Sequence, residues 1–118
     1  MTLKKAEYIL QHYYKLMNQK EQTAWRHWAL NYKIQHTQTD QDKKTVRIQR
    51  NYENGNLSKD PNILCLLESG IDQFKINTAK RIAKDHPEVL FMNNCPKCGK
   101  LARTPFAKQC QHCFHKWH

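Results

Sequence analysis

Two pairs of closely spaced cysteines restrict the fold of this chain more than any other feature of its sequence. Cys95 and Cys98 form one C-x-x-C pair, Cys110 and Cys113 form a second, and eleven residues separate the two pairs. Two intervening residues let both thiolates of a pair point into one tight turn, so each pair can hold two corners of a tetrahedral ion. The spacing therefore predicts one four-cysteine metal site assembled from both pairs.

Disulfide bonding and redox catalysis are the competing uses of such cysteines. Cys65 is the fifth cysteine, and an odd count argues against the disulfide framework of a secreted domain. The opening residues MTLKKAEYIL place Glu7 where a signal peptide needs an apolar residue, so we expect a cytoplasmic protein. No βαβ pattern surrounds either pair, which disfavours a thioredoxin-like redox site.

The longest wholly apolar run is Ile63 to Leu67, which is far shorter than the roughly 20 residues that a membrane-spanning helix needs. We therefore expect no membrane partner. Cys65 lies within this run, and we expect it to be a small buried hydrophobe.

Zinc is the ion that best suits four thiolates closed around one site. Iron is the alternative, because the segment CPKCG resembles the metal-binding turn of rubredoxins. A closed set of four protein ligands leaves no open position for an activated water, so we expect a structural metal. The last 24 residues contain no Asp or Glu, and we therefore expect neither an enzymatic activity nor a small-molecule substrate.

Histidines are the other candidate ligands near the cysteines. His112 lies within the second pair, His115 follows that pair, and His118 is the last residue of the sequence. His112 or His115 could replace a cysteine ligand or hydrogen-bond to a thiolate. With four cysteines present, we expect all three histidines to lie outside the ligand set.

The segment NNCPKCGKLARTPFAKQCQHCFHKWH resembles a zinc ribbon, with the four cysteines at the ligand positions. Preceded by a helical region, it also resembles a group of small, uncharacterised bacterial zinc-ribbon proteins, a likeness that implies no particular activity. We expect a strand over Leu101 to Thr104, a turn at Pro105 and a closing strand over Phe114 to Trp117. Gly99 follows the first pair, as is common in ribbons, whereas Phe114 follows the second, so the second turn lacks a glycine for positive φ.

We expect a mainly α fold with a helical region over residues 1–87, followed by a small β-type zinc ribbon over 88–118. Apolar residues recur every three, four or seven positions over the first 35 residues, which contain neither Gly nor Pro. This pattern predicts one long helix, or two with a break within Asn18 to Gln22 and Thr23 as the second cap.

Helix signals also bound two shorter segments later in the chain. Asp60 and Pro61 are a cap and a first helical residue, which predicts a helix over 61–69. A second apolar stripe predicts a helix over 72–86, ended by Pro87. Val89 to Met92 is expected to be a short strand.

The polar segment 36–58 is compatible with two structures. Thr39 and Asp42 form a loose capping signal for a helix that would end at Asn54 and Gly55. The alternation of Val46 and Ile48 with polar residues would instead suit a hairpin turning at Asn54 and Gly55. We favour the helix.

The formal net charge of +10 is uneven, since residues 1–57 carry ten basic and five acidic groups and residues 95–118 carry five basic and none acidic. Such surfaces attract polyanions. The candidate nucleic-acid contacts are Lys97, Lys100, Arg103, Lys108 and Lys116 around the cysteines, and Lys43, Lys44, Arg47 and Arg50 in the polar segment.

Two groups of aromatic residues accompany these cations. We expect Phe106, Phe114 and Trp117 to form the small core of the ribbon rather than to stack on bases. We expect Trp25, Trp28 and Tyr32 to pack against the helices at 61–85, because they share one helix face.

The function predicted from these features is a non-enzymatic, zinc-stabilised binding protein that contacts RNA, DNA or a ribonucleoprotein. The alternative is a protein–protein adaptor that docks on a larger protein machine through its zinc ribbon. An iron-binding electron carrier is the third and least favoured possibility.

Overall fold

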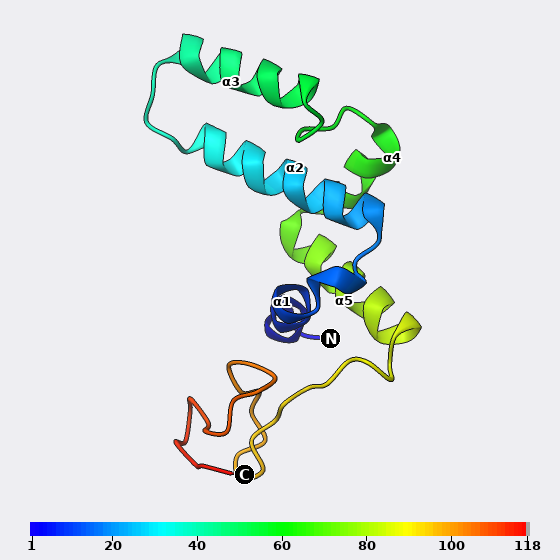
Figure 1. Cartoon of the computed structure of the whole chain (residues 1–118), viewed down its shortest axis with the longest axis vertical. Helices are drawn as coiled ribbons and strands as arrows, with labels where there is room; N and C mark the ends of the chain where they lie inside the picture. Colours follow the sequence, from blue (N-terminus) through cyan, green and yellow to red (C-terminus); the bar gives the residue numbers. More distant parts are fainter. Residues whose placement is uncertain (118) are drawn as a thin grey trace. The chain divides into compact units, whose positions relative to one another are not determined.

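Helices make up most of the chain, as expected for a mainly α protein (Figure 1). The computed structural model describes residues 1–117. Within these residues the α-helices are α1 (Leu3–His12), α2 (Gln19–Gln35), α3 (Gln41–Glu53), α4 (Pro61–Leu64) and α5 (Ile71–Asp85), and the 3₁₀ helices are η1 (Tyr14–Leu16) and η2 (Cys65–Leu67). None of these helices is both long enough and apolar enough to span a bilayer.

The chain divides into two compact units, whose boundaries differ from the one expected after residue 87. One unit, here called the split unit, combines Met1–Met17 with the chain from Lys75 onward. The other, the inserted unit, comprises Asn18–Phe74, so the division falls within α5. The expected division into a helical region over residues 1–87 and a zinc ribbon over 88–118 stays a prediction.

Helix α1 of the split unit is short because the first 35 residues break earlier than the sequence suggested. Thr2 caps the helix by accepting a hydrogen bond from the Lys5 N–H at 3.2 Å. Tyr13 leaves the helical conformation, and η1 follows. The buried face of α1 consists of Ala6, Tyr8, Ile9 and Leu10. The two-helix alternative is therefore correct, with the break beginning at Tyr13.

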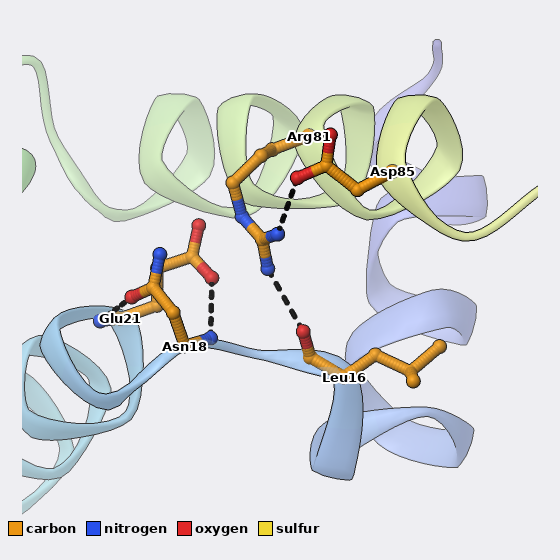
Figure 2. Close-up of polar contacts among 5 residues, drawn as sticks. All are labelled: Leu16, Asn18, Glu21, Arg81 and Asp85. Carbon is orange, nitrogen blue, oxygen red and sulfur yellow. Dashed lines mark hydrogen bonds and ion pairs between the residues drawn. The ribbon is translucent and has the colours of Figure 1, made fainter.

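An arginine on the second half of α5 ties that helix to the end of η1 (Figure 2). Arg81 donates from Nη2 to the carbonyl oxygen of Leu16 at 2.9 Å, and its Nη1 lies 2.9 Å from Oδ2 of Asp85. Neighbouring Thr78, Ala79 and Ile82 are the buried face expected from the apolar stripe. A charged group thus satisfies a carbonyl that no helix hydrogen bond would reach.

The start of α2, in the inserted unit, is set by a capping box (Figure 2). Asn18 Oδ1 accepts from the Glu21 N–H at 2.8 Å, and the Asn18 N–H donates to Glu21 Oε1 at 2.9 Å. Reciprocal bonds of this kind satisfy two of the free N–H groups at a helix start. The expected cap Thr23 lies inside the helix instead, where its hydroxyl donates to the Gln19 carbonyl.

A row of stacked aromatic rings runs along α2. Ring centroids lie 6.3 Å apart for Phe74 and Trp25, 5.8 Å for Trp25 and Trp28, 5.2 Å for Trp28 and Tyr32, and 4.0 Å for Tyr32 and His36. The expected packing against α5 is confirmed for Trp25 through Phe74. It fails for Tyr32, which is 52% exposed.

The polar segment forms a helix, and the hairpin alternative is wrong. Helix α3 runs antiparallel to α2 in Figure 1 and begins at the cap Asp40, whose Oδ1 accepts from the Lys43 N–H at 2.8 Å. It ends at Asn54, followed by Gly55 with φ +83°. The helix predicted over 61–69 is present as α4 and η2, with Asp60 as its cap.

Candidate metal centre

Each C-x-x-C pair folds into a tight turn of the same hydrogen-bond pattern. In the first turn, called knuckle 1 (residues 95–100), the Cys95 N–H donates to the Lys100 carbonyl at 2.8 Å. In knuckle 2 (residues 110–115), the Cys110 N–H donates to the His115 carbonyl at 2.8 Å. The two halves of the site are therefore built alike, as the repeated spacing predicts.

Single bridge pairs, rather than strands, close the two knuckles. Asn94 pairs with Leu101 and Gln109 pairs with Lys116, both antiparallel, and no strand forms within residues 1–117. The strands expected over 89–92, 101–104 and 114–117 are therefore wrong. Segment 89–92 begins in a turn after Pro87.

A buried amide explains why the chain curls instead of extending after knuckle 1. Asn93 is 5% exposed, and its Nδ2 donates to the carbonyls of Thr104 at 2.9 Å and Ala107 at 2.8 Å. These bonds hold the 104–107 turn against the segment that enters knuckle 1. Single bridge pairs stand in this bent segment in place of the longer ladder expected of a β-type ribbon.

The four cysteine sulfurs converge, as predicted from the sequence. All four Sγ atoms, from Cys95, Cys98, Cys110 and Cys113, lie within 4.8 Å of one another. The Cys95 and Cys113 sulfurs are 3.6 Å apart, and those of Cys98 and Cys110 are 3.5 Å apart. Tetrahedral zinc with Zn–S bonds of about 2.3 Å places its sulfurs about 3.8 Å apart, so the donor set fits this ion.

Histidine takes no part in the cluster of ligand atoms found within residues 1–117. His112 is exposed, and His115 stacks on Trp117 with ring centroids 6.4 Å apart. His118 lies outside the described residues.

Backbone N–H groups point at the first sulfur of each knuckle. The Cys110 sulfur accepts from the N–H groups of Cys113 at 3.4 Å and His112 at 3.3 Å, and these bonds, the one from Cys113 above all, lower the pKa of Cys110 to about 6. At Cys95, burial raises the pKa, but the N–H groups of Cys98 and Lys97 and the neighbouring thiols outweigh it, so the pKa falls. The first cysteine of each knuckle therefore favours the thiolate, which is the form that binds metal.

Cys98 has the opposite shift. The Lys100 N–H lowers its pKa, but burial and the three neighbouring sulfurs together raise it to about 11. Closely spaced thiolates repel one another, so the last proton is hard to remove. A divalent cation at the centre of the cluster would offset this repulsion.

Helix α1 holds the segment that enters knuckle 1. The Tyr8 and Tyr13 hydroxyls donate to the Phe91 carbonyl at 3.2 and 3.1 Å, and the Asn93 N–H donates to Tyr8 Oη at 3.4 Å. His12 donates to the Arg103 carbonyl at 3.2 Å through Nε2. Burial raises the pKa of the Tyr8 hydroxyl. Sequence patterns did not identify these supporting residues, because their partners lie 78 to 91 positions away.

All five candidate cations of the cysteine segment are exposed: Lys97, Lys100, Arg103, Lys108 and Lys116. The expected aromatic core is wrong for two of its three members, since Phe106 is 90% exposed and Phe114 is 70% exposed. Trp117 is half-buried. A shallow groove beside knuckle 2 is lined by Arg103, Lys108, Gln109, Gln111 and Phe114, among others.

The four basic candidates of the polar segment lie on α3, in the inserted unit. Lys43 and Arg50 are exposed, whereas Lys44 and Arg47 are half-buried. Lys43 is 3.9 Å from Asp40, and Lys44 Nζ donates to the Gln35 carbonyl at 3.4 Å. The four therefore do not present one uniformly exposed face.

Cys65, the fifth cysteine, takes no part in the cluster of four sulfurs. Cys65 is exposed rather than buried, and its thiol donates to the Asn62 carbonyl at 3.2 Å.

No family model, curated protein or solved structure matches this chain. The convergence of the four sulfurs supports the metal centre, and the likeness to bacterial zinc-ribbon proteins stays an expectation from the cysteine motif.

Proposed function

We propose that this chain is a non-enzymatic, zinc-stabilised protein of the cytoplasm that binds nucleic acid, alone or in a ribonucleoprotein, through its cysteine segment. The observation that carries the proposal is the surface around the metal centre. Phe114 is 70% exposed there, and five exposed cations lie in the same segment. Cations contact phosphates and exposed rings stack on bases, and proteins that bind nucleic acid combine the two.

Zinc has a structural role in this proposal. Four cysteine ligands fill a tetrahedral site, so the ion holds knuckles 1 and 2 together. Burial in the cysteine segment is slight, which is why metal binding would supply much of its folding free energy, on the order of 10 kcal/mol. We propose that residues 88–118 act as a zinc-ribbon-like module. An iron–thiolate centre would absorb visible light, so the absorption spectrum of the purified protein distinguishes iron from zinc.

Charge distribution in this module supports a polyanion such as nucleic acid as its partner. The segment 95–117 contains five Lys or Arg and no Asp or Glu, so it stays net positive even with the net charge of about −2 that four thiolates around Zn²⁺ would carry. Each phosphate that a cation neutralises releases counterions, and the binding constant then falls steeply with salt.

The test is fluorescence anisotropy of the zinc-loaded full chain with single-stranded RNA and duplex DNA, from about 50 to about 300 mM salt. The double variant Lys100→Gln, Arg103→Gln should bind several times more weakly and have a smaller salt slope. A matched double variant on α5, Lys80→Gln, Lys84→Gln, changes the net charge equally and should bind like the wild type.

Two results would contradict the proposal. Wild-type protein that binds neither polymer at low salt would leave the adaptor alternative, which predicts a protein complex that survives nuclease. Equal losses in both double variants would mean that net charge alone causes the binding.

A further inference from the structure

We infer that the groove beside knuckle 2 is a binding site for single-stranded nucleic acid, with one unpaired base stacked on Phe114. This inference rests on the proposed function and specifies its ligand. The groove combines the three elements that such a site needs, namely an exposed ring, cations for phosphates and amides for base edges.

The backbone of Phe114 has a conformation that is unusual for a residue other than glycine. Its φ is +63°, and it is the one residue other than glycine with positive φ within residues 1–117. Gly99, at the equivalent position of knuckle 1, has φ +76°. A side chain in this conformation is strained, by about 1 kcal/mol or more, and strained residues cluster at functional sites. A ring in this position is therefore not explained by the turn.

The ring of Phe114 is not packed into a core. Phe114 is 70% exposed, so packing does not repay the strain either. An exposed ring in a groove lined by Arg103 and Lys108 is instead suited to a flat, anionic ligand. The bases of a duplex are already stacked on one another, so a base that stacks on Phe114 has to be unpaired.

Side-chain amides line the same groove. Gln109 Nε2 donates to the Phe114 carbonyl at 3.2 Å, which holds this amide at the backbone of Phe114 and leaves the amide oxygen as an acceptor. Gln111 lines the same groove and is exposed. Amide groups both donate and accept, and can therefore bind the edges of a base.

Replacing Phe114 with glycine separates the ring from the fold. Because glycine adopts positive φ without strain, Phe114→Gly should keep its zinc and fold at least as well as the wild type. Any loss of affinity then reports on the ring. Phe114→Asn, which also tolerates this conformation, is a second variant without the ring. Phe106→Ala is the matched control, because Phe106 is exposed but does not line the groove.

The experiment measures the affinity of the zinc-loaded full chain for oligo(dT) of about 12 nucleotides and for an abasic strand with the same number of phosphates. Wild-type protein should bind oligo(dT) about tenfold more tightly than the abasic strand. Phe114→Gly and Phe114→Asn should abolish this difference while the salt slope is unchanged. Phe106→Ala should alter neither affinity by more than about twofold.

The contradictory outcomes are distinct. Equal wild-type affinity for the two strands, or full oligo(dT) affinity in Phe114→Gly, would overturn the stacking site and leave the proposed function in place. A loss in Phe106→Ala as large as that in Phe114→Gly would overturn the assignment to this groove. Failure of the wild type to bind either strand at low salt would overturn the single-strand site, and failure to bind RNA and duplex DNA as well would contradict the proposed function itself.

Discussion

Gly99 and Phe114 occupy equivalent positions in the two knuckles. The N–H of Gly99 donates to the Cys95 carbonyl at 2.9 Å, and the N–H of Phe114 donates to the Cys110 carbonyl at 3.1 Å. Both residues have positive φ. The same turn is thus made once by the residue that suits it and once by a residue that does not.

This equivalence predicts opposite effects of two substitutions on stability. Phe114→Gly should stabilise the metal-bound fold by up to about 1 kcal/mol, because glycine removes the backbone strain. Gly99→Ala should destabilise it by about 1 kcal/mol. No atom lies within 4 Å of a methyl group at Gly99, so its loss would come from the backbone alone. Competition with a chelator measures both, because a change of 1.4 kcal/mol corresponds to about tenfold in metal affinity. A destabilised Phe114→Gly would contradict the equivalence.

Metal protection can be measured by counting reactive thiols. In the zinc-loaded protein, we expect an alkylating reagent to modify Cys65 rapidly and the four ligands slowly, since metal-bound sulfur is a poor nucleophile. After chelation, mass spectrometry should detect five modified cysteines. Cys98 is also exposed, so exposure alone would predict its modification. Rapid modification of Cys98 with zinc present would therefore argue against its role as a ligand, and Cys65→Ser is the control that removes the first adduct.

The contacts of Arg81 predict a difference between the two sides of its ion pair. Arg81→Gln should reduce the free energy of unfolding by about 1–2 kcal/mol, because the Leu16 carbonyl loses a charged donor. Asp85→Asn should cost at most about 0.5 kcal/mol, since Asp85 is half-exposed and lies at the last turn of α5. Urea unfolding measures both, with Lys84→Gln as a charge control. Equal losses would mean that the ion pair, and not the carbonyl contact, carries the stability.

His27 predicts a pH dependence of the inserted unit. Its Nδ1 accepts a hydrogen bond from the Ser58 N–H at 3.0 Å, and burial lowers its pKa below 6.5. Because the pKa of His27 is lower in the folded chain, the unfolded chain binds the proton more readily below pH 6.5. The stability that is present above pH 6.5 is therefore lost as the pH falls through the folded pKa.

A variant that keeps the acceptor and removes the titration tests this effect. His27→Asn retains an oxygen at the position of Nδ1. The urea midpoint of the wild type should therefore fall more between about pH 7.5 and about pH 5 than that of His27→Asn. Parallel pH profiles of the two proteins would show that His27 does not contribute.

The sequence predicts those parts of the site that depend on spacing along the chain. The convergence of the four cysteines follows from two short turns, whose geometry is local. The start of α2 was misplaced at Thr23 because Asn18 competes for the same role and gains a second bond from Glu21. Such competition between nearby caps is a small difference in free energy, which pattern reading does not resolve.

Exposure and long-range contacts were beyond the sequence for a different reason. Phe106 and Phe114 were expected in a core because of their apolar side chains, but a segment held by metal can fold without burying them. The contact of Tyr8 with Phe91 joins residues 83 positions apart, and no local periodicity records it.

The division of the split unit between the two parts of the chain has a consequence for the order of folding during synthesis. The inserted unit, Asn18–Phe74, is complete when it leaves the ribosome, whereas the hydroxyls of Tyr8 and Tyr13 have to wait for Phe91. Helix α1 therefore emerges before the inserted unit and acquires its partners only after the inserted unit has been synthesised. During that interval the apolar face of α1 is exposed to water, and only molecules that bind the nascent chain can cover it.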